Sequence, residues 1–336
     1  MKRILLYLAF LATLLPAAVM AAPVAEEPQL PDTLAVGTTD SFIGEGLVKI
    51  VVRKGVKKIR KAVQAKDSER AAHKAVYGTP SLNKLFPGKQ LGSVRIATYN
   101  VGTFTKSGYD RTVMVSDMLK ELKVDAAALQ ELDSCTTRTG GTFQLLELAE
   151  SAGGMDYWFT PALDPYQNGA YGIGIISKSR MKPVCAWEMP LEKGRGSEQR
   201  ALSVVEYRKL VLACTHLDNK NATARQNQAQ AITDALMSRY GGTHKVVVLC
   251  GDFNDKPSSK VIRQMARNWT VVSCNGNTYP SDKPKQCIDY IMVLDNNSSY
   301  EVRRSFVAGE FRNGKVSEAS DHLPVWVDIK ARRASE

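Results

Sequence analysis

Short apolar runs with β-strand character alternate with segments of helical spacing from residue 93 onward, and this alternation limits the possible folds most. The strand-like runs cover residues 93–101, 124–132, 171–177, 201–207, 210–216, 244–250, 287–294 and 322–329. Helical spacing of apolar residues covers 110–123, 142–152 and 222–239. Helices between strands must cover the faces of a sheet, so the sequence predicts a layered α/β domain. With 44% hydrophobic residues, the chain of 336 residues can build a sizeable core.

One strand-like run ends abruptly in polar groups. The stretch VVVLCGDFNDKP, residues 246–257, places Asp252, Asn254 and Asp255 directly after buried strand positions. A turn would account for Gly251 and one carboxylate, because Asp and Asn favour turns. Asp252 and Asn254 lie two residues apart, so an extended backbone would aim both side chains the same way. This pairing suits metal or phosphate chemistry.

Other strand-like runs carry similar groups at their ends. Three runs finish at Asn100, Glu131 and His216, one begins at Asp289, and another is entered through Asp321 and His322. Each residue taken alone has an ordinary structural explanation, such as a turn cap, an ion pair or a buried histidine. Together they predict one site, because strand ends gather at one edge of a sheet.

The ordered set of these residues resembles the endonuclease/exonuclease/phosphatase superfamily over about residues 93–330. The segments GDFN (251–254) and SDHLP (320–324) are the most specific parts of the resemblance. The resemblance implies an α/β four-layer sandwich, in which two packed mixed β-sheets are flanked by helices and the active site lies at one sheet edge. It also implies a catalytic domain over residues 93–333. The sequence departs from some relatives at Gly102, where they carry an acidic residue.

The resemblance and the chemistry of phosphate esters agree on a metal site. A divalent ion neutralises the phosphate charge that would repel hydroxide. Glu131 is expected to be the principal ligand of Mg²⁺ or Mn²⁺, since these ions prefer oxygen ligands. Asn100 is expected to help hold the ion or the phosphate, and Asp321 to complete the metal set.

Five further residues are expected to carry the chemistry. Asp252 would orient or deprotonate the attacking water, and Asn254 would donate its amide to a phosphoryl oxygen. His322 would bind phosphate and carry a proton, with Asp289 fixing its tautomer. His216 would approach the phosphate from the other side and stabilise developing charge.

Two arginines are weaker candidates for substrate binding. Arg200 begins a strand and could hold a phosphate with two hydrogen bonds, or form a surface salt bridge. Arg225 lies three residues before Gln228 on one face of the helix that follows His216. These two side chains could face the pocket or solvent.

The amino-terminal part predicts export. Lys2 and Arg3 precede an apolar run, and small residues precede Ala22, so residues 1–21 read as a signal peptide of a secreted or periplasmic protein. Pro16 interrupts the run and argues against a transmembrane anchor. Residues 22–92 are expected to form a linker and a basic amphipathic helix. That helix could dock on the main domain, or bind nucleic acid or an anionic membrane surface through residues 47–65.

All six cysteines lie in the part that would be exported. Cys274 and Cys287 flank a turn-rich segment and are the expected disulfide pair, whereas Cys214 and Cys250 end apolar runs and could be small core residues. No CxxC pair occurs, which argues against a structural zinc site.

The sequence therefore predicts an exported, monomeric, metal-dependent phosphoesterase whose substrate is a phosphodiester of nuclease or lipid type. The net charge of residues 93–336 is only +4, so no strong basic track for nucleic acid is evident. Residues 155–171 are a candidate apolar loop for lipid binding, although Trp158 and Phe159 could instead belong to the core. A phosphomonoesterase for sugar or inositol phosphates and a non-catalytic binding module on the same fold are the alternatives.

Overall fold

The computed structural model describes residues 88–89 and 91–332. The expected signal peptide (1–21) lies outside the described residues, and so does nearly all of the linker and basic helix expected over 22–92. Within the described part, no helix combines the length and the apolar character needed to cross a membrane.

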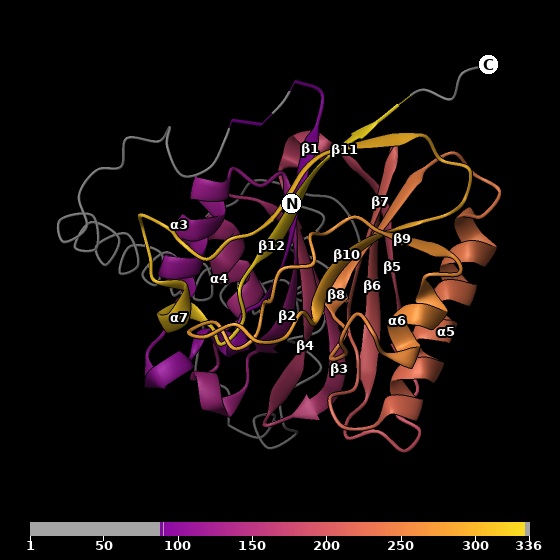
Figure 1. Ribbon diagram of the computed structural model, residues 1–336. Helices are drawn as coiled ribbons and strands as arrows, with labels where there is room; N and C mark the ends of the chain where they lie inside the picture. Colours follow the sequence, from indigo (N-terminus) through magenta and orange to yellow (C-terminus); the bar gives the residue numbers. More distant parts are fainter. Residues whose placement is uncertain (1–87, 90, 333–336) are drawn as a thin grey trace, which may run out of the picture. The chain divides into compact units, whose positions relative to one another are not determined.

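Two six-stranded sheets pack against each other (Figure 1). The first, which we call sheet 1, is mixed, because β1 and β2 are parallel and its other neighbouring strands are antiparallel. Its strands are, in spatial order, β11 (Tyr300–Val307), β12 (Val325–Ala331), β1 (Val94–Asn100), β2 (Ala126–Ser134), β4 (Gly169–Ser177) and β3 (Asp156–Tyr166).

The second sheet, sheet 2, has the same mixed character. Its parallel pair is β7 and β8, and its other pairs are antiparallel. Its strands are, in spatial order, β5 (Pro183–Leu191), β6 (Arg200–Tyr207), β7 (Leu210–His216), β8 (Val246–Asp252), β10 (Asp289–Leu294) and β9 (Trp269–Val271).

Helices cover the outer faces of both sheets and complete four layers. The helices α3 (Thr112–Leu122) and α4 (Gln144–Ser151) pack on sheet 1, and α5 (Ala222–Tyr240) and α6 (Lys260–Met265) pack on sheet 2 (Figure 1). The short helix α7 (Val316–Ala319) precedes β12. Short 3-10 helices span Gly102–Phe104, Lys106–Gly108, Thr137–Thr139 and Ser179–Met181. The expected four-layer α/β sandwich is confirmed.

Three apolar clusters fill the spaces between these layers. In β1, Ile96 belongs to the cluster between the sheets, whereas Ala97 and Tyr99 belong to the cluster under α3 and α4. Successive strand residues point to opposite faces, so a strand covered on both faces must be apolar throughout. This explains why the central strands were recognisable from sequence as continuous apolar runs.

The segment expected as a candidate lipid-binding loop is instead mainly a strand. Residues Asp156–Tyr166 form β3, which pairs with β4 in a hairpin. Trp158 packs against the cluster between the sheets and Phe159 against the cluster under α3 and α4. The structure therefore assigns both rings to the packing of the core.

The expected disulfide between Cys274 and Cys287 is absent, and all six cysteines are free thiols. Cys287 is buried in the apolar cluster under α5 and α6, and its burial raises the pKa of its thiol. Cys274 is half-buried, and its backbone N–H donates to Ser305 on β11. Cys214 and Cys250 are small core residues between the sheets, as one alternative predicted.

A buried ion pair joins β1 to β12 on the helix-covered side of sheet 1. Arg95 and Asp328 are fully buried and face each other in the ladder, with two N–O distances of 2.7 Å. The guanidinium also donates to the Leu122 carbonyl at 2.7 Å and lies 4.1 Å from the ring centroid of Trp326. Its charge is thus matched on nearly every side, which a buried charge requires.

We expect Asp328→Ala to lower the free energy of unfolding by about 3–5 kcal/mol, because it leaves the Arg95 guanidinium buried without its counter-charge. Urea denaturation measures this change. The matched control is Glu318→Ala, which removes an exposed pair with Lys315 and should cost less than about 1 kcal/mol. Equal losses in the two variants would contradict this interpretation of the buried pair.

Candidate active site

The predicted gathering of polar residues occurs at one end of the sandwich. Asn100, His216 and Asp252 are the last residues of β1, β7 and β8. Asp289 begins β10, which runs antiparallel to β8 and places Asp289 directly opposite Asp252. Polar residues of the two sheets therefore meet where the ends of the sheets lie side by side, and we call this place the seam.

The side-chain amide of Asn100 joins the two sheets at this seam. Its Nδ2 donates to Glu131 Oε1 of sheet 1 and to Asp252 Oδ2 of sheet 2, each at 3.0 Å. Its Oδ1 accepts from the Gly102 N–H at 3.2 Å, which fixes the orientation of the amide. Asn100 is 1% exposed and holds the buried carboxylate of Asp252 close to the half-buried carboxylate of Glu131.

Glu131 reaches the site through a β-bulge. It was expected at the end of a strand, but β2 continues to Ser134, and the register with β4 shifts between Gln130 and Leu132. Glu131 has a φ of +59°, a left-handed conformation that turns its side chain out of the regular alternation. Burial raises the pKa of Glu131, although the hydrogen bond from Asn100 opposes the shift, and the nearby Asp321 carboxylate adds to it.

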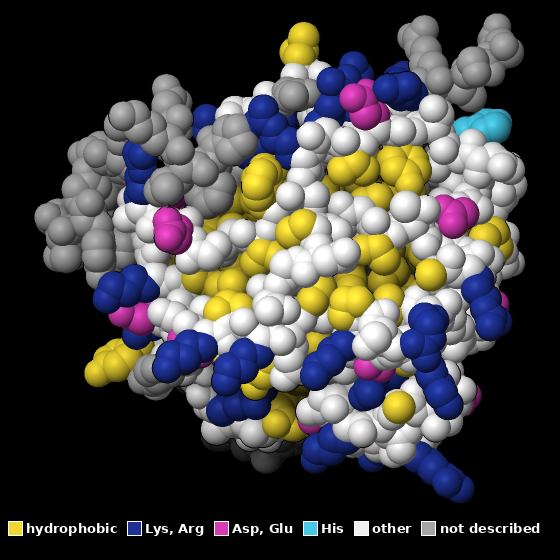
Figure 2. Space-filling model, viewed as in Figure 1, with side chains coloured by type: hydrophobic (Ala, Val, Ile, Leu, Met, Phe, Trp, Pro, Cys, Tyr) yellow, Lys and Arg dark blue, Asp and Glu magenta, His cyan; other side chains and the backbone are white. Residues whose placement is uncertain are grey.

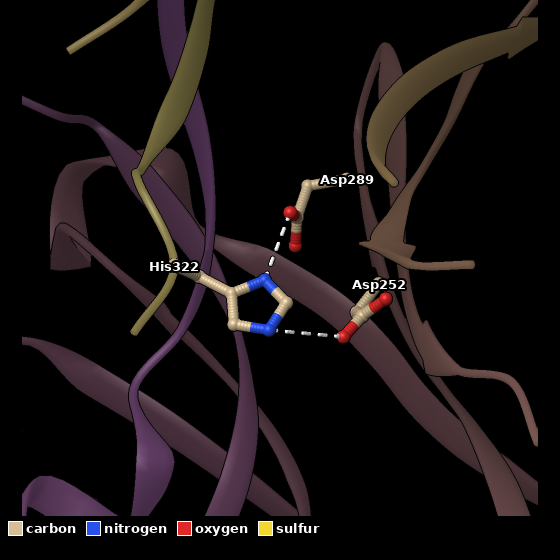
Figure 3. Close-up of side chains that lie close together, drawn as sticks. All are labelled: Asp252, Asp289 and His322. Atoms are coloured by element: carbon tan, nitrogen blue, oxygen red, sulfur yellow. Dashed lines mark hydrogen bonds and ion pairs between the residues drawn. The ribbon is translucent and has the colours of Figure 1, made fainter. Parts of the chain in front are cut away.

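Figure 3 shows the His322 imidazole between the carboxylates of Asp289 and Asp252. Nδ1 donates to Asp289 Oδ2 at 3.0 Å, and Nε2 lies 3.6 Å from Asp252 Oδ2. Burial alone would lower the pKa of His322, but the two carboxylates raise it to about 10. The expected partnership of Asp289 with His322 is therefore present, and the ring is a cation at neutral pH.

His322 differs from expectation in its backbone setting. It was expected to enter a strand, but β12 begins only at Val325, after Pro324. A turn holds the ring instead, since the His322 N–H donates to Ser320 Oγ at 3.1 Å. The Tyr279 ring covers the imidazole with a centroid distance of 4.9 Å.

His216 lies on the other side of Asp252 in the opposite charge state. Burial lowers the pKa of His216 well below its usual range, and the positive charges of Arg200 and His322 lower it further. Its Nε2 lies 3.5 Å from Asp252 Oδ2. The site thus pairs a neutral with a cationic imidazole, as in sites where acid and base roles are divided.

The side chain of Asn254 contacts His216. Its Nδ2 lies 3.0 Å from His216 Nε2 and donates to the Leu217 carbonyl at 3.1 Å. The extended backbone expected through Asn254 is wrong, because the residue has a φ of +50°. The geometry places Asn254 where it can orient His216, and its role as a phosphate donor stays a prediction.

The two candidate arginines have different surroundings. Arg200 begins β6 as expected, is 3% exposed, and its Nε has no hydrogen-bond partner within the described residues. Its ion pair is a 3.5 Å contact with the exposed Glu198. Arg225 instead binds Asp255 at 2.9 Å and the Asp218 carbonyl at 3.0 Å, so it stabilises a loop beside the site.

The carboxylates of the site fit a hard divalent cation. Burial and the adjacent Asp289 raise the pKa of Asp252, and Asp289 Oδ1 is buried without a hydrogen-bond partner among the described residues. Asp321 is exposed at the rim, next to Gly102. The carboxylates of Glu131 and Asp321 form no ion pair within the described residues and offer oxygen ligands, which Mg²⁺ and Mn²⁺ prefer.

A second group could also hold a metal by distance alone. The ligand atoms of Asp252, Asp289 and His322 lie within 4.8 Å of one another. Both ring nitrogens of His322, however, already face carboxylate oxygens, Nδ1 that of Asp289 at 3.0 Å and Nε2 that of Asp252 at 3.6 Å. We therefore assign this group to hydrogen bonding and retain Asn100, Glu131 and Asp321 as the candidate metal set.

Several residues that support the site were not identified from the sequence. Thr278 donates to Asp289 Oδ2, and Ser320 donates to the Asn100 carbonyl at 2.6 Å. Nothing in the local sequence around Thr278 indicates this contact, because it depends on the path of a long loop. Asp218 could have been found, since the run DNKN after Leu217 is typical of an Asx turn.

Asp218 anchors the loop that borders the site between β5 and β6. Its carboxylate accepts from the Lys220 and Asn221 N–H groups and from the Ser197 hydroxyl and N–H. Although burial would raise it, these bonds lower the pKa of Asp218 to about 2. The loop of residues 192–199 is therefore held against the end of β7.

Comparisons with known proteins agree on one family. The sequence model of the Endonuclease/Exonuclease/phosphatase family matches residues 97–322. No curated protein sequence matches the chain.

Similar solved structures share the fold. They include a mannosyl-6-phosphatase from Bacteroides thetaiotaomicron VPI-5482 (TM-score 0.59, 19% identity, covering 70% of this chain and 99% of that one). The catalytic domain of human Nocturnin with bound sulfate has a TM-score of 0.55 and 19% identity, and covers 72% and 94% of the two chains. A humanized D. rerio TDP2 has a TM-score of 0.55 and 15% identity, and covers 71% and 99%.

We expect Asp218→Ala to release the loop of residues 192–199, because four donors lose a charged acceptor. Tryptic cleavage after Lys193 and Arg195 should then become at least roughly tenfold faster, since proteolysis follows local opening. The control is Asp234→Ala on the exposed face of α5. Unchanged cleavage in Asp218→Ala would show that the loop is held by other contacts.

Proposed function

The chain belongs to the endonuclease/exonuclease/phosphatase family, whose members are hydrolases of phosphoesters, and from this premise we propose that it hydrolyses a phosphodiester by metal-assisted attack of water. The convergence of Asp252 with Asn100, His216 and His322 at the seam carries the proposal. The Asp252 carboxylate is thereby surrounded by the amide of Asn100, which belongs to the candidate metal set, by the neutral imidazole of His216 and by the cationic imidazole of His322.

The candidate metal set supports this chemistry. Mg²⁺ or Mn²⁺, when bound, neutralises phosphate charge and makes phosphorus more electrophilic. Glu131 and Asp321 would hold it through carboxylate oxygens, with Asn100 keeping Glu131 in place through the bond to Oε1.

The protein's own side chains would then act around the phosphate. Asp252 would orient the attacking water and accept its proton. His322 is held by Asp289 as a hydrogen-bond donor, so it would stabilise charge on a phosphoryl oxygen and supply a proton. Arg200, with an Nε that lacks a partner, would bind a second phosphoryl oxygen.

The balance of charge favours a diester over a monoester. Glu131, Asp252, Asp289 and Asp321 bring four carboxylates to the site. Besides His322, Arg200 is the candidate cation for the substrate, because Arg225 is paired with Asp255, and Lys106 is directed at Ser281 and the Ser320 carbonyl. A diester carries one negative charge and a monoester up to two. A phosphomonoesterase, which the name of the mannosyl-6-phosphatase neighbour suggests, is the second candidate.

The distribution of charged and apolar side chains on the surface is compatible with either a nucleic acid or a lipid as the diester. On the face shown in Figure 2, apolar side chains occupy much of the centre, and Lys and Arg side chains lie at the top and in a broken row below the centre. Among the described side chains of this face, no continuous band of Lys and Arg crosses the centre. The signal-peptide pattern of residues 1–21 supports an exported enzyme, and the basic residues at 47–65 support binding to nucleic acid or an anionic membrane.

We expect the purified chain to hydrolyse at least one phosphodiester only when a divalent ion is present, because the carboxylates alone would repel the substrate. The test compares Mg²⁺ with chelator on plasmid DNA, RNA, sphingomyelin, inositol phosphates and bis(4-nitrophenyl) phosphate. Full activity after exhaustive chelation would contradict the metal mechanism. Hydrolysis of none of these substrates would favour the binding module.

Glu131→Gln should raise the Mg²⁺ concentration needed for half-maximal turnover, on the order of 10–100-fold, because a charged ligand becomes neutral. Glu150→Gln, an exposed change on α4, is the matched control and should leave this concentration unchanged. The same Mg²⁺ dependence in both variants would remove Glu131 from the metal set.

Asp289 and His322 should behave as one unit. His322→Ala should lower turnover on the order of 10²–10⁴-fold, as for a positioned proton carrier. Asp289→Asn keeps the size but lets the amide favour the wrong imidazole tautomer, so it should also be slow. In the double variant the losses should not multiply. Fully multiplicative losses, with folding confirmed by circular dichroism, would show that Asp289 acts independently of His322.

A further inference from the structure

A basic pocket lies at the opposite end of the sandwich from the candidate active site. This distal pocket, of about 300 Å³, is formed where α3 ends, where β2 begins, and where β4 ends. The seven residues of β1 span the sheet from this end to Asn100, which corresponds to roughly 20 Å. The distal pocket therefore shares no residue with the site that would carry out hydrolysis.

Five cationic side chains line the distal pocket, namely Lys89, Lys120, Lys123, Lys178 and Arg180. The buried carboxylate of Asp125 serves three of them, with N–O distances of 2.6 Å to Lys89, 2.5 Å to Arg180 and 3.7 Å to Lys178. Lys120 lies 3.7 Å from Asp117. The lining therefore carries more positive than negative charge.

The stability of the fold explains only part of the excess of positive charge in the distal pocket. Asp125 also accepts the Arg95 N–H at 2.8 Å, so its burial is already well compensated. Lys120 and Lys123 stand at the carboxyl end of α3, where cations offset the helix dipole.

Lys178, however, is crowded by like charge: burial lowers the pKa of Lys178, and Arg180 and Lys89 lower it further while Asp125 opposes them. The exposed Lys123 side chain has no acceptor within the described residues.

The floor of the distal pocket is apolar. Leu119 and Val124 are nearly fully buried there, and Met155 is 8% exposed. The half-buried Ala152 and the methylene chains of the lysines add accessible apolar surface above them. A cationic rim over an apolar floor, in a volume at the lower end for small-molecule sites, fits a ligand with a charged head and an organic body.

We propose that the distal pocket binds a phosphate ester, with its phosphoryl group among Lys123, Lys178 and Arg180 and its organic part against Ala152, Met155 and the methylene chains of the lysines. Phosphoryl oxygens can accept hydrogen bonds from several cations at once, and Arg180 uses one of its guanidinium nitrogens for Asp125. The ester is either a lipid headgroup or a free small molecule, which share this chemistry. The proposal is independent of the hydrolytic function.

The test measures binding to the full chain by calorimetry with chelator present, so that hydrolysis does not interfere. The probes are dihexanoyl phosphatidic acid below its micelle concentration, glycerol 3-phosphate and inorganic phosphate. The pocket variant combines Lys123→Ala with Lys178→Ala. Arg200→Ala removes binding at the active site, and Lys283→Ala with Lys285→Ala removes two exposed lysines elsewhere.

We expect the pocket variant to bind the ester probes at least roughly tenfold more weakly, while Arg200→Ala and the lysine control retain this binding. Preference for dihexanoyl phosphatidic acid would identify the lipid source, and equal binding of glycerol 3-phosphate the free ester. If the double variant unfolds, Lys123→Ala alone should still weaken binding about threefold. Unchanged binding in the pocket variants, or an equal loss in the lysine control, would overturn the proposal.

Discussion

The amide of Asn100 holds together two carboxylates that would otherwise repel each other inside the protein. Glu131 comes from sheet 1 and Asp252 from sheet 2, and both hydrogen bonds measure 3.0 Å. Buried carboxylates are costly unless they are paired. The ends of the two sheets can therefore meet at the seam because Asn100, and then His322, supply donors between them.

The same balance of charge explains the division of labour at the seam. His322 lies between two carboxylates and is a cation, whereas His216 lies in the field of Arg200 and is neutral. Two identical side chains thereby acquire different roles from their neighbours. The scarcity of free cations around four carboxylates supports our proposal of a singly charged phosphodiester as the substrate.

The central strands and their terminal residues could be predicted from sequence, and the edges of the sheets could not. The strands β1, β7 and β8 are buried on both faces and therefore read as apolar runs. The strands that were missed include β3, β5 and β11, which are edge strands. Edge strands tolerate proline, as at Pro161 and Pro190, and these three strands are only partly buried, so they lack the continuous apolar run of the central strands.

Local backbone geometry limited the prediction of the site in a similar way. The identities of Asn100, Asp252, Asp289 and His322 followed from strand ends and from the family resemblance. The bulge at Glu131 and the left-handed Asn254 depend on neighbouring strands and on the ring of His216, which local sequence does not reveal. Arg225 was ambiguous because its partner, Asp255, is distant in sequence.

We propose that the seam activates water for direct attack on a phosphodiester, with no covalent intermediate on His216 or His322. The most direct test is the stereochemical course of hydrolysis of a diester made chiral at phosphorus with sulfur, in water enriched in oxygen-18. A single direct displacement inverts the configuration at phosphorus, and this is the result we predict. Retention of configuration would indicate two displacements through a phosphorylated side chain and would contradict the role assigned to Asp252.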